Sequence, residues 1–236
     1  MTKSSTRRPV RLNSSERLAK DLRGFGPAGI FALTTIFLLG TLSIANIAIP
    51  VGALLVLVWA RMSHTPLREI GYVRPRSWLR TIVAGIVFGC VFKLLSKSVI
   101  MPLLGAGPIN LVYQHLQGNT AMLPFAAWTM IVAGFAEETM FRGYAFERLN
   151  KLIGKRRWSA AVIVLLTSLL FGLAHYPQQG FTGAEHAFIM GLVFGTVYAL
   201  KGRLFLLMIA HAAYDLMAIA LIYWRLEWDV AHLFFR

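Results

Sequence analysis

The chain has 236 residues, of which 57% are hydrophobic and only 14% are charged, and its mean hydropathy is +0.62. Because soluble globular domains are usually about 25% charged, this composition excludes an ordinary soluble domain and indicates a protein of membrane-spanning helices. The single cysteine, Cys90, excludes an intramolecular disulfide and a cysteine metal cluster.

The first half of the chain predicts a basic tail and three membrane spans. Residues 1–24 hold seven Lys or Arg and predict a solvated tail in the cytoplasm. Residues 25–62 are almost wholly apolar, and they are too many for one crossing of about 20 residues. Since proline disfavours the helical state in the residue before it, we expect a break near 43–50 that divides this stretch into two spans. A loop with five arginines follows at 61–80, and 81–104 is the third predicted span.

The second half of the chain predicts further spans joined by short turns. They are expected at 121–148, 159–175, 185–200 and 204–224. The fold class is therefore all-α: a polytopic bundle of about seven membrane helices that forms one domain over residues 25–236.

The net charge of +14 follows the predicted topology. With the N-terminus in the cytoplasm, most of the 24 Lys and Arg lie in inner segments, and the outer loops at 105–120 and 176–184 hold none. The positive-inside rule describes this asymmetry. The charge therefore reflects orientation and contact with the lipid bilayer, and we expect no nucleic acid partner.

Two adjacent glutamates lie deep in the span at 121–148. They are Glu137 and Glu138, and Arg142 follows one helical turn later. Residues four apart share a helix face, so Glu138 and Arg142 are expected to pair, whereas Glu137 is rotated about 100° away. Ionisable residues inside a membrane are functional candidates, and a carboxylate with no cation of its own is suited to accept a proton from water.

Two histidines lie in or near other spans. His175 ends the span at 159–175 and shares a face with Phe171, while His211 and Asp215 share a face of the last span. Asp215 is therefore placed to orient the ring of His211. A water molecule held between Glu137 and a histidine would be activated to attack a carbonyl group. The other histidines (His64, His115, His186 and His232) are predicted to lie at the surface.

These residues fall into three motifs. "EETMFR" fits Glu-Glu-x-x-x-Arg, "FGLAH" fits Phe-x-x-x-His and "HAAYD" fits His-x-x-x-Asn/Asp. In this order, on successive apolar helices, the chain resembles the CAAX-protease and bacteriocin-processing (CPBP) family of intramembrane endopeptidases. The resemblance covers about residues 67–216, and it implies a catalytic core at about 121–224.

The resemblance also implies roles for the motif residues. Glu137 and His175 would activate the hydrolytic water, and Glu138 and Arg142 would form a supporting pair. His211 matches the histidine of the third motif, and Asp215 takes the position where the prenyl-protein endopeptidases mostly have an asparagine that stabilises an oxyanion. A charged aspartate cannot donate a hydrogen bond. Three interpretations therefore stay open: His211 takes the oxyanion role, a protonated Asp215 takes it, or Asp215 orients His211.

The resemblance implies a glutamate-dependent protease that needs no cofactor. Zinc is the alternative, with Glu137, His175, His211 and Asp215 as its ligands, since histidine and carboxylate are ordinary zinc ligands. The sequence has no His-Glu-x-x-His signature of the common zinc proteases.

The sequence therefore predicts a glutamate-type intramembrane endopeptidase in a cell membrane, by default the inner membrane of a bacterium. Its partner would be a peptide or protein substrate in the bilayer: a prenylated C-terminus, a leader peptide or a membrane segment. The alternative is a membrane scaffold, an immunity factor or a proton-coupled carrier that uses the same buried acids without proteolysis. The lack of a visible inverted repeat disfavours a carrier.

One expectation conflicts with this site. At 1.5 Å per residue, Glu137 lies roughly 16 Å from the inner end of its span if that end is Arg148, whereas His175 lies roughly 27 Å from Arg157. Either the span of His175 starts deeper or tilts, or the span of Glu137 is bent between Gly134 and Gly143.

Overall fold

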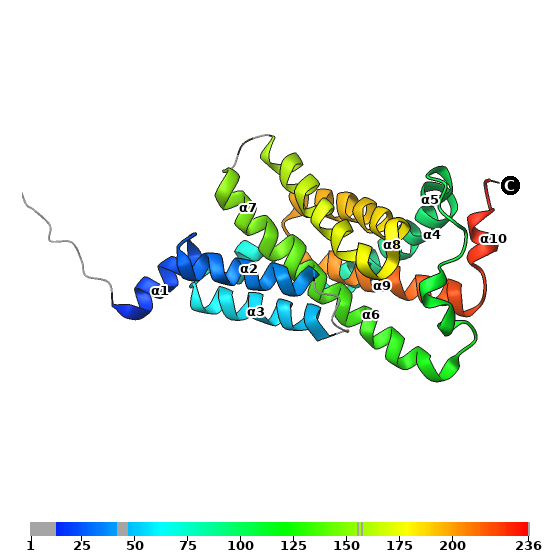
Figure 1. Cartoon of the computed structure of the whole chain (residues 1–236), viewed down its shortest axis with the longest axis horizontal. Coiled ribbons are helices and arrows are strands. Elements are labelled where there is room, and N and C mark those ends of the chain that lie inside the picture. The colour runs from blue at the N-terminus through cyan, green and yellow to red at the C-terminus, as the bar shows by residue number, and fades with distance from the viewer. Residues whose placement is uncertain (1–12, 42–46, 155, 157, 236) are drawn as a thin grey trace, which may run out of the picture.

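A computed structural model describes the chain except for residues 1–12, 42–46, 155, 157 and 236. The described residues form helices and no strands, which confirms the all-α prediction (Figure 1). The α-helices are α1 (Ser14–Arg23), α2 (Pro27–Thr41), α3 (Ala48–Met62), α4 (Trp78–Leu95), α5 (Met101–Leu103), α6 (Leu123–Glu137), α7 (Ala145–Ile153), α8 (Ser159–Lys201), α9 (Leu204–Tyr223) and α10 (Glu227–Ala231). The 3-10 and π segments are η2 (Leu67–Ile70), η3 (Ser96–Ile100), η4 (Leu111–Leu116), η5 (Thr120–Met122) and η6 (Glu138–Tyr144).

The helices suit a membrane protein by length and composition. Within the described part, 4 helices are long and apolar enough to cross a bilayer: Trp78–Leu103, Thr120–Ile153, Ser159–Lys201 and Leu204–Tyr223. The count rises to 5 if α1 and the following helix, bent by 50°, form one span, and α3 is a shorter apolar helix. The protein is therefore an integral membrane bundle, and a total of seven crossings stays a prediction.

The N-terminal segment is partly folded onto the bundle. Where a solvated tail was expected, α1 forms a helix that buries Ala19 and Leu22. Arg148 of α7 donates through Nη1 to the carbonyl oxygens of Arg23 and Gly24, each at 3.2 Å, so it caps the end of α1. The expectation for residues 1–12 lies outside the described residues.

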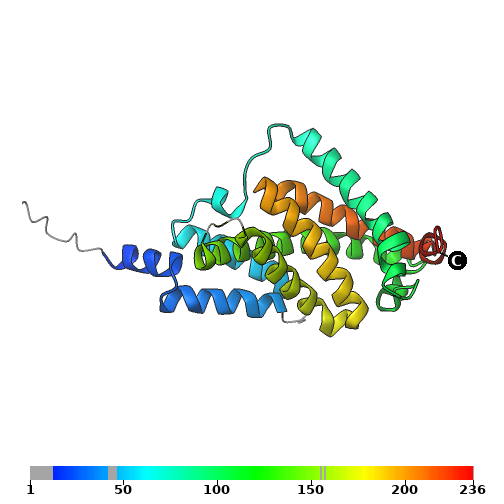
Figure 2. The same ribbon diagram turned by 90° about the horizontal axis from the view of Figure 1, so that it is seen from above.

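Helix α8 folds back on itself. Gly180 has φ 65° and ψ −165°, a conformation that is nearly restricted to glycine. On either side of it the helix forms two antiparallel arms that pack against each other. Two distances show this packing: a Cβ added to Gly172 would lie 3.1 Å from Phe188, and one added to Gly191 would lie 2.8 Å from Ser168. Figure 2 shows the two arms side by side. They correspond to the spans predicted at 159–175 and 185–200, with a reversal at one glycine in place of a loop.

The predicted conflict in depth does not exist in the structure. Helix α7 continues past Arg148 to Ile153, and α8 begins at Ser159. Counted from these two ends, Glu137 and His175 are the same number of residues away. Both side chains therefore lie roughly 24 Å from the turn that joins these helices. The rings of Phe141 and Phe171, 5.0 Å apart, show the same register.

A close helix pair supports the other side of the site. A Cβ on Gly89 of α4 would lie 2.1 Å from the carbonyl oxygen of Ala210 and 2.9 Å from the backbone nitrogen of Tyr214, both in α9. Only a glycine allows this approach. The contact fixes the part of α9 that carries His211 and Asp215.

Candidate active site

The glutamate pair begins a π-helical segment. Helix α6 ends at Glu137, and η6 runs from Glu138 to Tyr144. Such segments occur mostly as local insertions in α-helices, often at functional sites. The expected pair is present, since Arg142 Nη1 donates to Glu138 Oε1 over 2.9 Å and both side chains are almost completely buried. The Arg142 guanidinium also lies 4.6 Å from the ring centre of Phe171.

Glu138 holds His211 as well as Arg142. His211 Nδ1 lies 2.8 Å from Glu138 Oε1, the same oxygen that accepts from Arg142. The other ring nitrogen, Nε2, lies 3.5 Å from Glu137 Oε2 and 3.6 Å from Asp215 Oδ2. The shortest contact of the ring is therefore with Glu138, so Glu138 does more than Asp215 to set its orientation.

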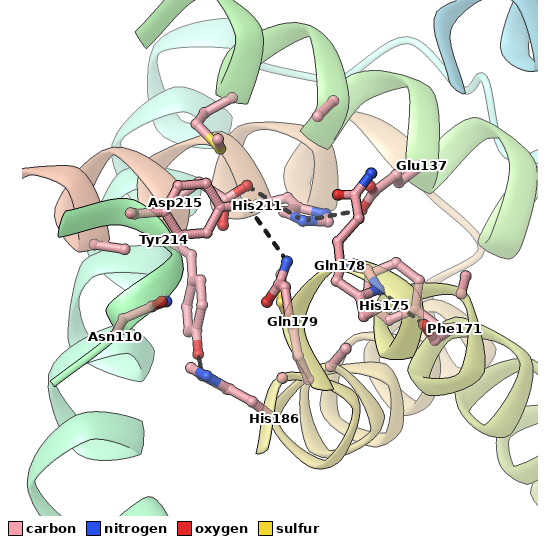
Figure 3. Close-up of a pocket in the computed structure, with 18 of the residues that line it drawn as sticks. Asn110, Glu137, Phe171, His175, Gln178, Gln179, His186, His211, Tyr214 and Asp215 are labelled. Atoms are coloured by element: carbon pink, nitrogen blue, oxygen red, sulfur yellow. Dashed lines mark hydrogen bonds and ion pairs between the residues drawn. The ribbon is translucent and has the colours of Figure 1, made fainter. Parts of the chain in front are cut away.

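His175 faces the same site from the first arm of α8. Its Nδ1 lies 2.8 Å from the carbonyl oxygen of Phe171 and donates to it, because a carbonyl can only accept. In the neutral ring this leaves Nε2 as an acceptor. Figure 3 shows Glu137, His175 and His211 around one pocket.

The pocket is a cavity of about 180 Å³. Of the predicted residues, Glu137, His175, His211 and Asp215 line it. Glu138 and Arg142 lie behind this wall, where they contact His211 and each other. The structure thus brings all six predicted residues together, four at the cavity and two in support. Other polar residues that line it are Lys93, Asn110, Tyr113, Thr129, Gln178, Gln179, His186 and Tyr214.

The prediction that His186 lies at the surface is wrong. Its Nε2 lies 3.0 Å from Ser96 Oγ and also contacts the hydroxyl of Tyr214. The reversal at Gly180 turns the second arm of α8 back along the cavity, and this carries His186 inward. Its place within the span predicted at 185–200 was the sequence signal for burial.

Tyr113 reaches the cavity from η4, in a loop without a recognisable motif. Gln179 Nε2 donates to its hydroxyl oxygen over 3.4 Å. Burial, together with the negative charges of Asp215 and Glu137, raises the pKa of Tyr113 to about 12, so the phenol is protonated at neutral pH. Glu227 holds the loop, since it accepts from the backbone nitrogen of Asn110 and from the side chain of Gln114.

The zinc alternative would take its ligands from Glu137, His175, His211 and Asp215. In the part of the chain that the structure describes, no group of three or more His, Cys, Asp or Glu is arranged to hold a metal ion. Both nitrogens of His211 face carboxylates, and Nδ1 of His175 faces a backbone carbonyl. A zinc centre at these four residues stays a prediction.

Comparison with known proteins adds a family to this geometry. Residues 119–217 match the family model described as type II CAAX prenyl endopeptidase Rce1-like. Over this stretch the chain is similar to an Rce1-like domain. This domain contains all three motifs, so the predicted resemblance to the CPBP family is confirmed, and it indicates a protease embedded in the membrane. No curated protein and no solved structure matches the chain. Lys93 and Tyr113 lie outside the Rce1-like domain, although both line its cavity.

Proposed function

We propose that the protein is an intramembrane endopeptidase in which Glu137 and His175 activate a water molecule. The observation that carries this proposal is the meeting of the two side chains at one cavity, inside the Rce1-like domain, from helices in matched register. Glu137 has its carboxylate at the cavity, and His175 has Nε2 available as an acceptor. Together they suit the removal of a proton from water.

The reaction follows from these roles. The activated water attacks the carbonyl carbon of the substrate, so that a carbon–oxygen bond forms and the carbonyl oxygen becomes an oxyanion. The carbon–nitrogen bond then breaks, and the proton taken by Glu137 or His175 passes to the leaving nitrogen. No metal takes part in this scheme.

Glu138 and Arg142 act by position. The charge of Glu138 is balanced by Arg142 and shared with His211, so Glu138 is not available as a base. It fixes His211 with Nε2 toward Glu137 and Asp215. When this nitrogen carries a proton, His211 is a donor beside the developing oxyanion, and Asp215 stabilises the resulting positive ring.

Tyr113 would supply a second donor, where an ionised Asp215 cannot. Its hydroxyl oxygen already accepts from Gln179, so its own hydrogen is available to another acceptor. Burial and the negative charges of Asp215 and Glu137 raise the pKa of this hydroxyl. A phenol that stays protonated at neutral pH suits an oxyanion.

The substrate would be a peptide or protein that reaches the cavity from the bilayer. A prenylated C-terminus, a leader peptide and a membrane segment all satisfy the chemistry above. The default location is the inner membrane of a bacterium, because of the basic inner segments and the peptide-processing members of the family.

The proposal is tested by comparing peptide termini in membranes of cells that make wild type, Glu137→Gln or Glu185→Gln at equal levels. Glu185 is the control, since it lies in the second arm of α8 and does not line the cavity. New termini should appear with wild type and Glu185→Gln and vanish with Glu137→Gln. Identical termini in all three, with folded protein present, would favour a scaffold, immunity factor or carrier.

A further inference from the structure

Lys93 is a buried cation for which the cavity provides no counter-ion in contact. The residue lies in α4, is 8% exposed and lines the cavity. Its ammonium lies 4.8 Å from the centre of the Tyr214 ring. Across the described ranges of the chain, Lys93 forms no ion pair and no hydrogen bond. A buried charge of this kind is unfavourable unless something compensates it.

Lys97, one turn later, shows what compensation looks like in this protein. Its Nζ lies 2.9 Å from Glu227 Oε1, and both side chains are about as buried as that of Lys93. Glu227 also accepts from the backbone nitrogen of Asn110 and from Gln114, so both of its carboxylate oxygens accept hydrogen bonds. The chain thus supplies a contacting partner for one lysine of the pair and leaves the other facing the cavity.

The surroundings of Lys93 are polar and lie away from Glu137 and His175. The hydroxyl of Tyr214 contacts His186, and both approach Ser96. Figure 3 shows His186 and Tyr214 on one side of the pocket and Glu137 and His175 on the other. A substrate that crosses the cavity from Glu137 would therefore meet a cation and hydrogen-bonding groups at its other side.

We propose that Lys93 forms an anion subsite that binds a carboxylate of the peptide substrate, across the cavity from the bond that Glu137 attacks. This inference rests on the proposed function and adds a recognition element to it. Carboxylate is the anionic group that a peptide itself carries, and an ammonium binds it by a charge-assisted hydrogen bond. The carboxylate has two sources, the C-terminus of the peptide or an Asp or Glu side chain.

The test measures binding without cleavage. The purified Glu137→Gln protein in detergent is titrated with N-acetyl-Leu-Leu-Phe as the free acid and as the C-terminal amide, and Kd is taken from the shift in Tm. The free acid should bind at least about tenfold more tightly than the amide. In the double variant Glu137→Gln/Lys93→Met the two peptides should bind equally. N-acetyl-Leu-Leu-Glu amide separates the sources, because tight binding of this peptide assigns the subsite to a side-chain carboxylate.

Controls address charge and folding. Lys201→Met removes an exposed lysine at the end of α8 and should leave the preference for the acid unchanged. Lys93→Arg keeps the charge and should keep the preference, and Lys93→Gln replaces Lys93→Met if that variant does not fold. Because Lys93 has no counter-ion in contact, its replacement by Met should leave Tm equal or higher.

Two results would overturn the subsite. One is an equal response to the free acid, its amide and N-acetyl-Leu-Leu-Glu amide with Lys93 intact, including no response to any of the three. The other is a preference for the acid that survives Lys93→Met; a fall in Tm with that variant would then assign Lys93 to the support of Asp215. Neither result depends on hydrolysis. A failure of the proposed proteolysis would instead appear in the comparison of termini.

Discussion

Glu137 and Glu138 are adjacent in the chain, and yet their side chains have different surroundings. Glu138 is 0% exposed, and one of its oxygens serves both Arg142 and His211. Glu137 reaches the cavity, and its Oε2 lies 3.5 Å from His211 Nε2. A buried carboxylate that is held by an arginine and a histidine has a structural task, whereas one at a cavity can exchange a proton with water.

At the same scale, we predict that Tyr113→Phe lowers kcat about 100-fold and changes KM little, since it removes a single donor to the oxyanion. The measurement uses a peptide taken from the comparison of termini. Tyr223→Phe is the matched control, because its hydroxyl bonds to Thr120 away from the cavity. An unchanged kcat for Tyr113→Phe would assign the oxyanion to His211 alone.

Among the elements, the reversal of α8 at Gly180 does most to shape the cavity. It places His175 near the end of the first arm and His186 near the start of the second, and both line the cavity. The arms can pack closely because glycines occur where they meet, at Gly172 and Gly191. A reversal of this kind requires a backbone conformation that side chains other than glycine rarely adopt.

We therefore predict that Gly180→Ala destabilises the protein by about 1–3 kcal/mol through backbone strain alone. A Cβ at Gly180 would meet nothing within 4 Å, so no clash contributes. Gly107→Ala is the control, because its Cβ also meets nothing and its φ is not positive. Thermal unfolding in detergent measures both, and equal Tm values would show that α8 does not need this conformation.

On the scale of the whole molecule, charge and depth give a consistent orientation. The basic segments at 148–157 and 201–203 adjoin the ends of α7, α8 and α9, while η4 and the reversal at Gly180 lie at the other ends of these helices. Glu137 and His175 lie between the two, roughly 24 Å from the basic turn. From this arrangement the positive-inside rule predicts that the N-terminus lies in the cytoplasm.

This orientation is testable because the chain has a single cysteine. In a Cys90→Ser background, Gly107→Cys should react with a membrane-impermeant maleimide in intact cells. Lys201→Cys should react only after the membrane is opened. Both positions are exposed, so access to the reagent depends on the side of the membrane. The reverse pattern would contradict a cytoplasmic N-terminus.

The membrane class, the family resemblance and the first ion pair of the site follow from composition and local spacing alone. The apolar content predicted a membrane protein, and the three motifs predicted the resemblance to the CPBP family. The four-residue interval on one helix predicted the pairing of Glu138 with Arg142. These features need no knowledge of how one helix packs on another.

The depth of the site residues and the full lining of the cavity depend on contacts between distant segments, and these appear in the tertiary structure alone. It set the end of α7 at Ile153 and so matched the depths of Glu137 and His175. It joined Glu138 to His211 and brought Lys93 and Tyr113 to the cavity from outside the Rce1-like domain. Spacing along a helix fixes only which residues share a face. Which faces meet is decided by close packing, at points such as Gly89 against Ala210, where the absence of a side chain lets two helices touch.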